Sequence, residues 1–159
     1  MRRHDREITD RARILEVMAR CDVCRLALND HGWPYIVPLN FGMEDRGGVL
    51  RLYFHSAQEG HKVDLMAQDN RAAFEMDCRH ALAYDEARGY CTFYYESVMG
   101  RGRIVFLEGA EKQSALEALM RHYHPGREAW FDPSAMPRVL TYALEVEELF
   151  CKRKAAKPR

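Results

Sequence analysis

Short runs in which apolar and polar residues alternate with a period of two recur along the chain, which is the pattern of half-buried β-strands. In residues 23–30, Cys24, Leu26 and Leu28 fall on one face, and the run ends at the turn-forming residues 29–32. Six or so such strands follow one another with few and short helices between them. This order predicts a mainly β (α+β) fold, an antiparallel barrel or sandwich with flanking helices.

The other expected strands cover residues 33–44, 49–56, 71–78, 91–109 and 138–150, and residues 79–90 are polar and typical of turns. Helical spacing predicts helices at about 10–20, with Thr9 or Asp10 as the N-cap, at 57–68 and at 111–124. We find no internal repeat and no domain boundary, so residues 1–159 are expected to form one domain. The basic ends, at about 1–6 and 152–159, indicate solvated, fraying tails, with an electrostatic docking tail as the alternative.

Charge and hydropathy exclude several classes of protein. Twenty-four Lys and Arg residues balance 24 Asp and Glu residues, whereas a nucleic-acid binder normally has a basic excess. A net charge near zero also favours self-association. No apolar run approaches the roughly 18 residues of a membrane span, and the N-terminus lacks the apolar stretch of a secretory signal. We therefore expect a soluble, cytoplasmic protein with no membrane partner.

Two prolines interrupt the expected strand at residues 33–44. Pro34 and Pro38 cannot donate a hydrogen bond to a central ladder. The strand is therefore expected to lie at a sheet edge, to bend near Pro38, or to face a ligand there. An edge strand protected from aggregation by its proline is the simplest of these alternatives.

A candidate anion site lies where the strand at 49–56 leads into a helix. Ser56 and Glu59 have the spacing of a capping box, which predicts Ser56 as the N-cap. The unpaired N–H groups and positive dipole of a helix start attract anions, and Gly60 would let the backbone approach closely. His61 and Lys62 add cationic donors, with Lys62 the strongest candidate for a phosphate contact. The alternative is a capped surface helix whose His and Lys side chains face water.

Three motifs in these regions resemble one known family. The runs PYIVPLNFG, LYFHSAQEGHKVDLM and YESVMGRG occur in the order found in flavoproteins related to pyridoxamine 5′-phosphate oxidase. The sequence is most similar to their 5-nitroimidazole-resistance (Nim) branch, and the resemblance covers nearly the whole chain. FHSAxxGHK is the most specific of the motifs.

The resemblance implies a homodimeric split β-barrel that binds FMN in a cleft at the subunit interface. It assigns the edge of the isoalloxazine ring to Val37, Pro38, Leu39 and Asn40, and the ribityl phosphate to His55, Ser56, His61 and Lys62. It also brings Ser97, Val98 and Gly100 close to the flavin, from the same subunit or the other. From the sequence alone, a bent interior strand is the alternative for these three residues.

The implied activity is electron transfer from a reduced donor through FMN to a small acceptor such as a nitroaromatic compound. The chain ends LFCKRKAAKPR, which does not align with the C-terminal arginine motif of true pyridoxamine-phosphate oxidases, so that reaction is not expected. His55 is the one candidate proton donor, with a hydrogen bond to phosphate or to a strand end as its alternative role. A flavin or haem carrier of the same fold remains the alternative function.

A metal site is the rival interpretation of Cys21 and Cys24. With Cys78 and His80 these residues would make a Cys₃His set. Cys24, however, shares the apolar face of its strand, where a free cysteine behaves as a small hydrophobic residue. We therefore expect no metal.

Overall fold

One antiparallel sheet organises the chain, whose computed structural model describes residues 4–155. Eight strands form the sheet in the order β3-β2-β6-β7-β8-β5-β4, with β1 paired to the end of β8. The elements are η1 (His4–Arg6), β1 (Glu7–Ile8), α1 (Arg11–Met18), β2 (Cys24–Asp30), β3 (Trp33–Leu39), β4 (Gly42–Arg46), β5 (Val49–Ala57), α2 (His61–Gln68), β6 (Arg71–Asp85), β7 (Tyr90–Leu107), α3 (Gly109–Tyr123), η2 (Met136–Arg138) and β8 (Val139–Lys154). The mainly β prediction is confirmed, with two more strands than expected.

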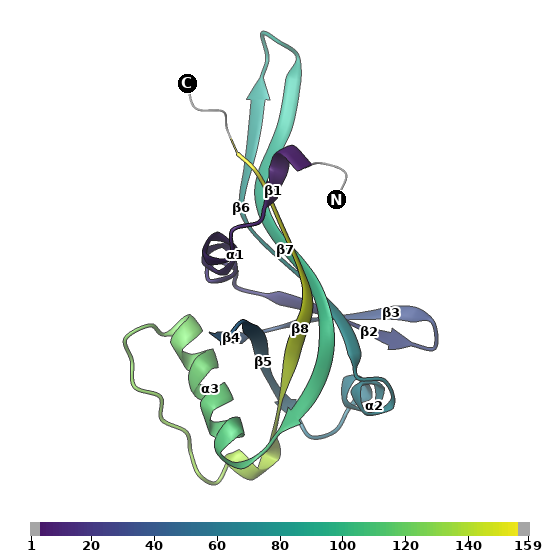
Figure 1. Cartoon of the computed structure of the whole chain (residues 1–159), viewed down its shortest axis with the longest axis vertical. Coiled ribbons are helices and arrows are strands. Elements are labelled where there is room, and N and C mark those ends of the chain that lie inside the picture. Colours follow the sequence, from purple (N-terminus) through teal and green to yellow (C-terminus); the bar gives the residue numbers. More distant parts are fainter. Residues whose placement is uncertain (1–3, 156–159) are drawn as a thin grey trace.

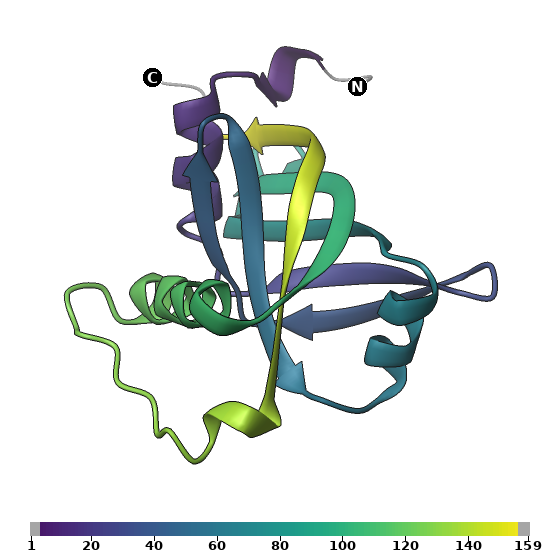
Figure 2. The same cartoon turned by 60° about the horizontal axis from the view of Figure 1, so that its bottom comes forward.

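The long strands β7 and β8 curve through the molecule and let the sheet wrap around an apolar interior (Figure 1). Alternate residues of β2, β5, β6 and β8 fill this interior, together with one face of α1 and of α2. The expected inward face of β2 is confirmed, because Cys24, Leu26 and Leu28 are all buried. Helix α2 lies beside the β2–β3 hairpin, on the other side of the molecule from α3 (Figure 2).

Helix α3 packs outside the barrel against β4, β5 and β8. Its buried contacts form a second apolar cluster of Tyr53, Leu107, Ala115, Ala118 and Ala143. Gly42 permits the close approach, since a Cβ atom there would lie 2.5 Å from the backbone nitrogen of Leu119. Among residues 4–155, no helix is long and apolar enough to cross a membrane.

The proline-bearing segment forms an edge strand, as predicted. Strand β3 ends the sheet order and pairs with β2, where Pro34 lies opposite Asn29 and Pro38 opposite Arg25. The expected single strand over residues 33–44 is divided, because β3 ends at Leu39 and two residues separate it from β4, which begins at Gly42. Proline is tolerated here because an edge strand has one side free of the ladder.

The predicted start of the second helix is wrong. Ser56 is not an N-cap: it lies in β5, and its hydroxyl donates to the carbonyl oxygen of Ala57 at 2.7 Å. Helix α2 begins at His61, with Gly60 as its N-cap and no side-chain cap. Pairing of β5 with β8 holds Ser56 and Ala57 in the extended conformation, and this ladder outweighs the local capping pattern.

The expectation that residues 79–90 are turn-like is right only for residues 86–89, which form the turn of a hairpin, and wrong for residues 79–85. Strand β6 continues to Asp85 through a bulge between Cys78 and Ala81, and β7 starts at Tyr90. The resulting hairpin projects beyond the body of the molecule (Figure 1). Its outer part pairs strand to strand with most side chains exposed, so it lacks the alternation that marks a half-buried strand.

The predicted C-terminal tail begins too early. Lys152 and Arg153 belong to β8, which continues to Lys154, and Cys151 just before them is buried. Arg153 forms an ion pair with the buried Glu96 at 3.1 Å, which anchors this end of the strand. At the other end Arg6 lies in η1. The remaining residues of the two predicted tails, 1–3 and 156–159, lie outside the described residues.

Candidate functional site

The candidate site lies at the corner where β5 ends and α2 begins. Between them Gly60 has a φ of +134°, in a region that side chains rarely adopt. A Cβ atom at Gly60 would find no other atom within 4 Å, so this glycine is exposed on that side. The predicted junction of strand, glycine and helix is therefore present, although the helix starts later than expected.

Helix α2 presents unpaired N–H groups at this corner. The N–H groups of Val63 and Asp64 both donate to the carbonyl oxygen of Gly60, at 2.8 and 3.2 Å. The backbone N–H groups of His61 and Lys62, at the start of the first turn, have no hydrogen-bond partner among residues 4–155. With the positive end of the helix dipole, they form an arrangement suited to an anionic oxygen.

The β2–β3 hairpin positions His61. The Nε2 atom of His61 lies 2.9 Å from Oδ2 of Asp30, at the end of β2. The ring of Tyr35 on β3 meets the imidazole edge to face, with ring centroids 5.0 Å apart. These two contacts fix the orientation of the imidazole and tie the edge strand to the helix start.

His55 and Lys62 influence each other electrostatically across the corner. Desolvation by surrounding atoms lowers the pKa of His55, and the positive charge of Lys62 lowers it further. In the ligand-free protein, His55 is therefore neutral at neutral pH and offers one donor and one acceptor nitrogen.

Thr141 is a polar residue at this corner that sequence reasoning missed. It pairs with His55 across the β5–β8 ladder and is fully buried. Its hydroxyl has no hydrogen-bond partner among the described residues. In the sequence it is one threonine in an apolar strand, which gives no signal of a role.

The predicted ring-contacting residues lie along β3 and just after it. Val37 and Leu39 are half-buried and pack against the core, whereas Pro38 and Asn40 are exposed. Tyr35, two residues before Val37, is the contact that links this strand to His61.

The three predicted flavin contacts on β7, Ser97, Val98 and Gly100, lie away from the helix corner within the protomer. Ser97 pairs with Lys152 on β8, whereas His55 pairs with Thr141, which is eleven residues earlier on the same strand. The hydroxyl of Ser97 is buried and has no hydrogen-bond partner among residues 4–155. Within one protomer the structure therefore does not bring Ser97 to the helix corner.

Val98 and Gly100 have roles inside the barrel. Val98 is fully buried in the core. A Cβ atom at Gly100 would lie 2.5 Å from the ring of Phe74, so glycine makes room for this aromatic side chain. Internal packing therefore accounts for both residues within the protomer.

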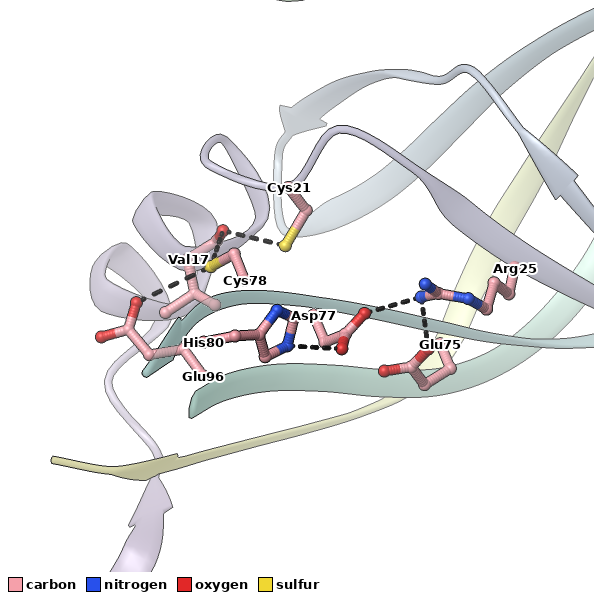
Figure 3. A network of polar contacts seen from close by, with 8 residues as sticks. All are labelled: Val17, Cys21, Arg25, Glu75, Asp77, Cys78, His80 and Glu96. Carbon is pink, nitrogen blue, oxygen red and sulfur yellow. Dashed lines mark hydrogen bonds and ion pairs between the residues drawn. The ribbon is translucent and has the colours of Figure 1, made fainter. Parts of the chain in front are cut away.

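Four of the five cysteines are buried, namely Cys21, Cys24, Cys78 and Cys151, whereas Cys91 is exposed. Cys21 and Cys78 both direct their thiols to the carbonyl oxygen of Val17, at 3.3 and 3.8 Å (Figure 3). Burial raises the pKa of Cys24 to about 12, and that of Cys151 to about 11. In residues 4–155, no group of three or more His, Cys, Asp or Glu residues is placed to hold a metal ion. The prediction of Cys24 as a small core residue is confirmed.

Comparison with known proteins places the chain in a class. The family model for pyridoxamine 5′-phosphate oxidase matches residues 10–153, almost the whole chain. The chain therefore belongs to this family, and its sheet with flanking helices has the split-barrel fold that the resemblance implied. No curated protein matches the sequence.

Among solved structures, a candidate 5-nitroimidazole antibiotic resistance protein of Bacteroides thetaiotaomicron is 32% identical. The match covers 94% of this chain and 90% of that one, with a TM-score of 0.76. This similarity is consistent with the Nim branch of the family.

Two more distant structures share the fold. The flavocytochrome Anf3 of Azotobacter vinelandii is 18% identical over all of this chain and 74% of its own, with a TM-score of 0.79. An FAD and haem binding protein of Mycobacterium smegmatis is 21% identical over 97% of this chain and 76% of its own, with a TM-score of 0.81.

Proposed function

We propose that the protein is a homodimeric, FMN-dependent oxidoreductase of the Nim type. It would pass electrons from a reduced donor through FMN to a small acceptor such as a nitroaromatic compound. Family membership over residues 10–153 and 32% identity to the Bacteroides protein support this assignment. Residues 149–159, LFCKRKAAKPR, do not align with the C-terminal arginine motif of true pyridoxamine-phosphate oxidases, and the proposed activity is therefore not oxidation of pyridoxamine phosphate.

The observation that carries the proposal is the helix corner. An exposed glycine before α2, two unpaired N–H groups and the side chain of Lys62 suit the phosphate of a flavin mononucleotide. The residues present therefore fit FMN in charge and in hydrogen-bonding capacity.

Each residue at the corner has a distinct part. Lys62 supplies the positive charge for the phosphate, and Asp30 holds His61 in a fixed orientation beside it. The neutral His55 can donate one hydrogen bond and accept another. When bound, the flavin would supply the two-electron chemistry, and the protein its binding and orientation.

The proposed homodimer rests on the separation between the expected flavin contacts. Ser97 and His55 pair with positions of β8 that are eleven residues apart, or about 35 Å for an extended strand. One flavin that touches both groups would need Ser97 from a second protomer. The bound substrate is expected to be a small molecule, and the cytoplasmic location stays a prediction.

A flavin or haem carrier without turnover is the second candidate. Two proteins of the same fold are described by these cofactors, a flavocytochrome and an FAD and haem binding protein. Such a carrier would share the helix corner but would need no acceptor site.

Absorbance spectroscopy of the purified protein mixed with FMN, then desalted, tests the proposal. We expect retained flavin, bleaching by NADH or NADPH without oxygen, and recovery of the oxidised spectrum on addition of a nitroaromatic compound. Free FMN at the same concentration is the control. Retained flavin that neither donor reduces would favour a flavin carrier. Protein that retains no flavin would contradict the oxidoreductase and the flavin carrier, and would leave a haem carrier to be tested with haem.

A further inference from the structure

Three arginines surround one buried carboxylate far from the helix corner. Glu96 on β7 is only 2% exposed. Its carboxylate lies 2.7 Å from Arg20 Nη2, 3.1 Å from Arg153 Nε and 3.7 Å from Arg79 Nε. The thiol of Cys78 approaches the same carboxylate at 3.9 Å (Figure 3). A single carboxylate thus balances one of the three positive charges.

The backbone is bent to bring Arg79 into this group. Arg79 has a φ of +56° at the bulge in β6, a conformation that is costly for a residue with a side chain. The bulge sends neighbouring side chains to different partners: Arg79 reaches Glu96, and His80 reaches Asp77 at 2.6 Å. Strain of this kind persists when the surrounding contacts hold it, and it is enriched at binding sites.

These arginines line a pocket of about 250 Å³ between α1, the base of the β6–β7 hairpin and the end of β8. Arg13 and Glu16 of α1 complete its charged lining. Four arginines against two glutamates leave an excess of two positive charges. Arg20 is also short of acceptors, because its Nε atom is buried and has no hydrogen-bond partner among the described residues.

We propose that this arginine pocket binds a small doubly charged oxyanion, such as inorganic phosphate or a short dicarboxylate. Guanidinium groups present paired donors that match carboxylate and phosphate oxygens. The pocket volume lies below the roughly 300–1,000 Å³ of pockets for drug-sized ligands, which fits a small anion. Within one protomer, helix α1 and the base of the β6–β7 hairpin lie away from α2 (Figure 1). In the proposed homodimer, Ser97, the neighbour of Glu96, would approach the flavin of the other protomer, so the two sites are separated by the control variants below.

Calorimetric titration of the full-length, FMN-treated protein with inorganic phosphate, and separately with succinate, tests the proposal at constant ionic strength. We expect one of the two probes to bind, and the probe that binds identifies the anion class. Arg79→Gln and Arg153→Gln should each weaken binding about tenfold or more, the size of a lost charged hydrogen bond. Arg13→Gln should also weaken it, and this exposed residue lies outside the ion pairs of Glu96, so the variant keeps the fold.

Two control variants separate this site from others. Arg88→Gln, in the exposed turn of the hairpin, should bind the probe as the wild type does. Lys62→Gln should weaken any binding of the probe at the helix corner. It should leave the binding that depends on the pocket arginines unchanged, whether or not the flavin assignment holds. Binding of neither probe, or equal binding by the wild type and all three pocket variants, would overturn the proposal.

Discussion

The lowered pKa of His55 makes the free energy of unfolding depend on pH. Its pKa in the folded protein is lowered, first by desolvation and then by Lys62, whereas the unfolded chain keeps the ordinary value of about 6.5. Between these two values the unfolded chain binds more protons than the folded one. The free energy of unfolding therefore falls as the pH drops below about 6.5, and this contribution is retained above it.

Replacing His55 by glutamine should remove this contribution. We expect the flavin-free wild type to lose stability from pH 7.5 to 5.5 more steeply than His55→Gln, measured by urea unfolding. The difference should be a fraction of the roughly 1.4 kcal/mol per pH unit of one full proton, because solvent reaches the ring. Parallel pH profiles for the two proteins would contradict the electrostatic description of the corner.

At the scale of elements, α1 and α2 begin in different ways. Asp10 caps α1 and accepts a hydrogen bond from the backbone nitrogen of Arg13 at 2.9 Å. Ser56 has the sequence pattern of a cap but lies inside β5. We expect Asp10→Ala to cost about 1 kcal/mol of unfolding free energy and Ser56→Ala less than about 0.5 kcal/mol. Thermal and urea unfolding of the two variants check this, and equal losses would show that the caps have been misassigned.

The sequence could predict those elements whose own residues are buried or paired in the way their local pattern indicates. Period-two alternation located the inward face of β2, and the prolines located the edge strand β3, because burial and pairing act directly on those residues. The outer part of the β6–β7 hairpin escaped prediction because neither of its faces is buried. The start of α2 was missed because pairing with β8, a distant strand, keeps Ser56 extended.

In the candidate site too, local sequence patterns identified only residues that are neighbours in the chain. Gly60, His61 and Lys62 are neighbours in sequence, so a local pattern was enough to group them. Asp30 and Thr141 reach the corner only through the fold, and neither has a local signal.

For the whole molecule, the resemblance grouped residues that one protomer keeps apart. Ser97 lies on strand β7, whereas Lys62 lies in the first turn of helix α2. The packing of Val98 and Gly100 is accounted for inside the barrel. A sequence motif can identify the expected flavin contacts, but it does not indicate which protomer supplies each of them. The proposed homodimer therefore rests on the family resemblance and on the separation of Ser97 from the helix corner.

The phosphate contact at Lys62 is the central claim, and comparing FMN with riboflavin tests it because riboflavin lacks the phosphate. Dissociation constants of both should be measured for the wild type, Lys62→Ala and the control Arg88→Ala. We expect the wild type to prefer FMN, and Lys62→Ala to bind FMN about tenfold or more weakly with little change for riboflavin. Arg88→Ala should behave as the wild type. Equal affinity of the wild type for both flavins, or an unchanged FMN affinity in Lys62→Ala, would contradict the account.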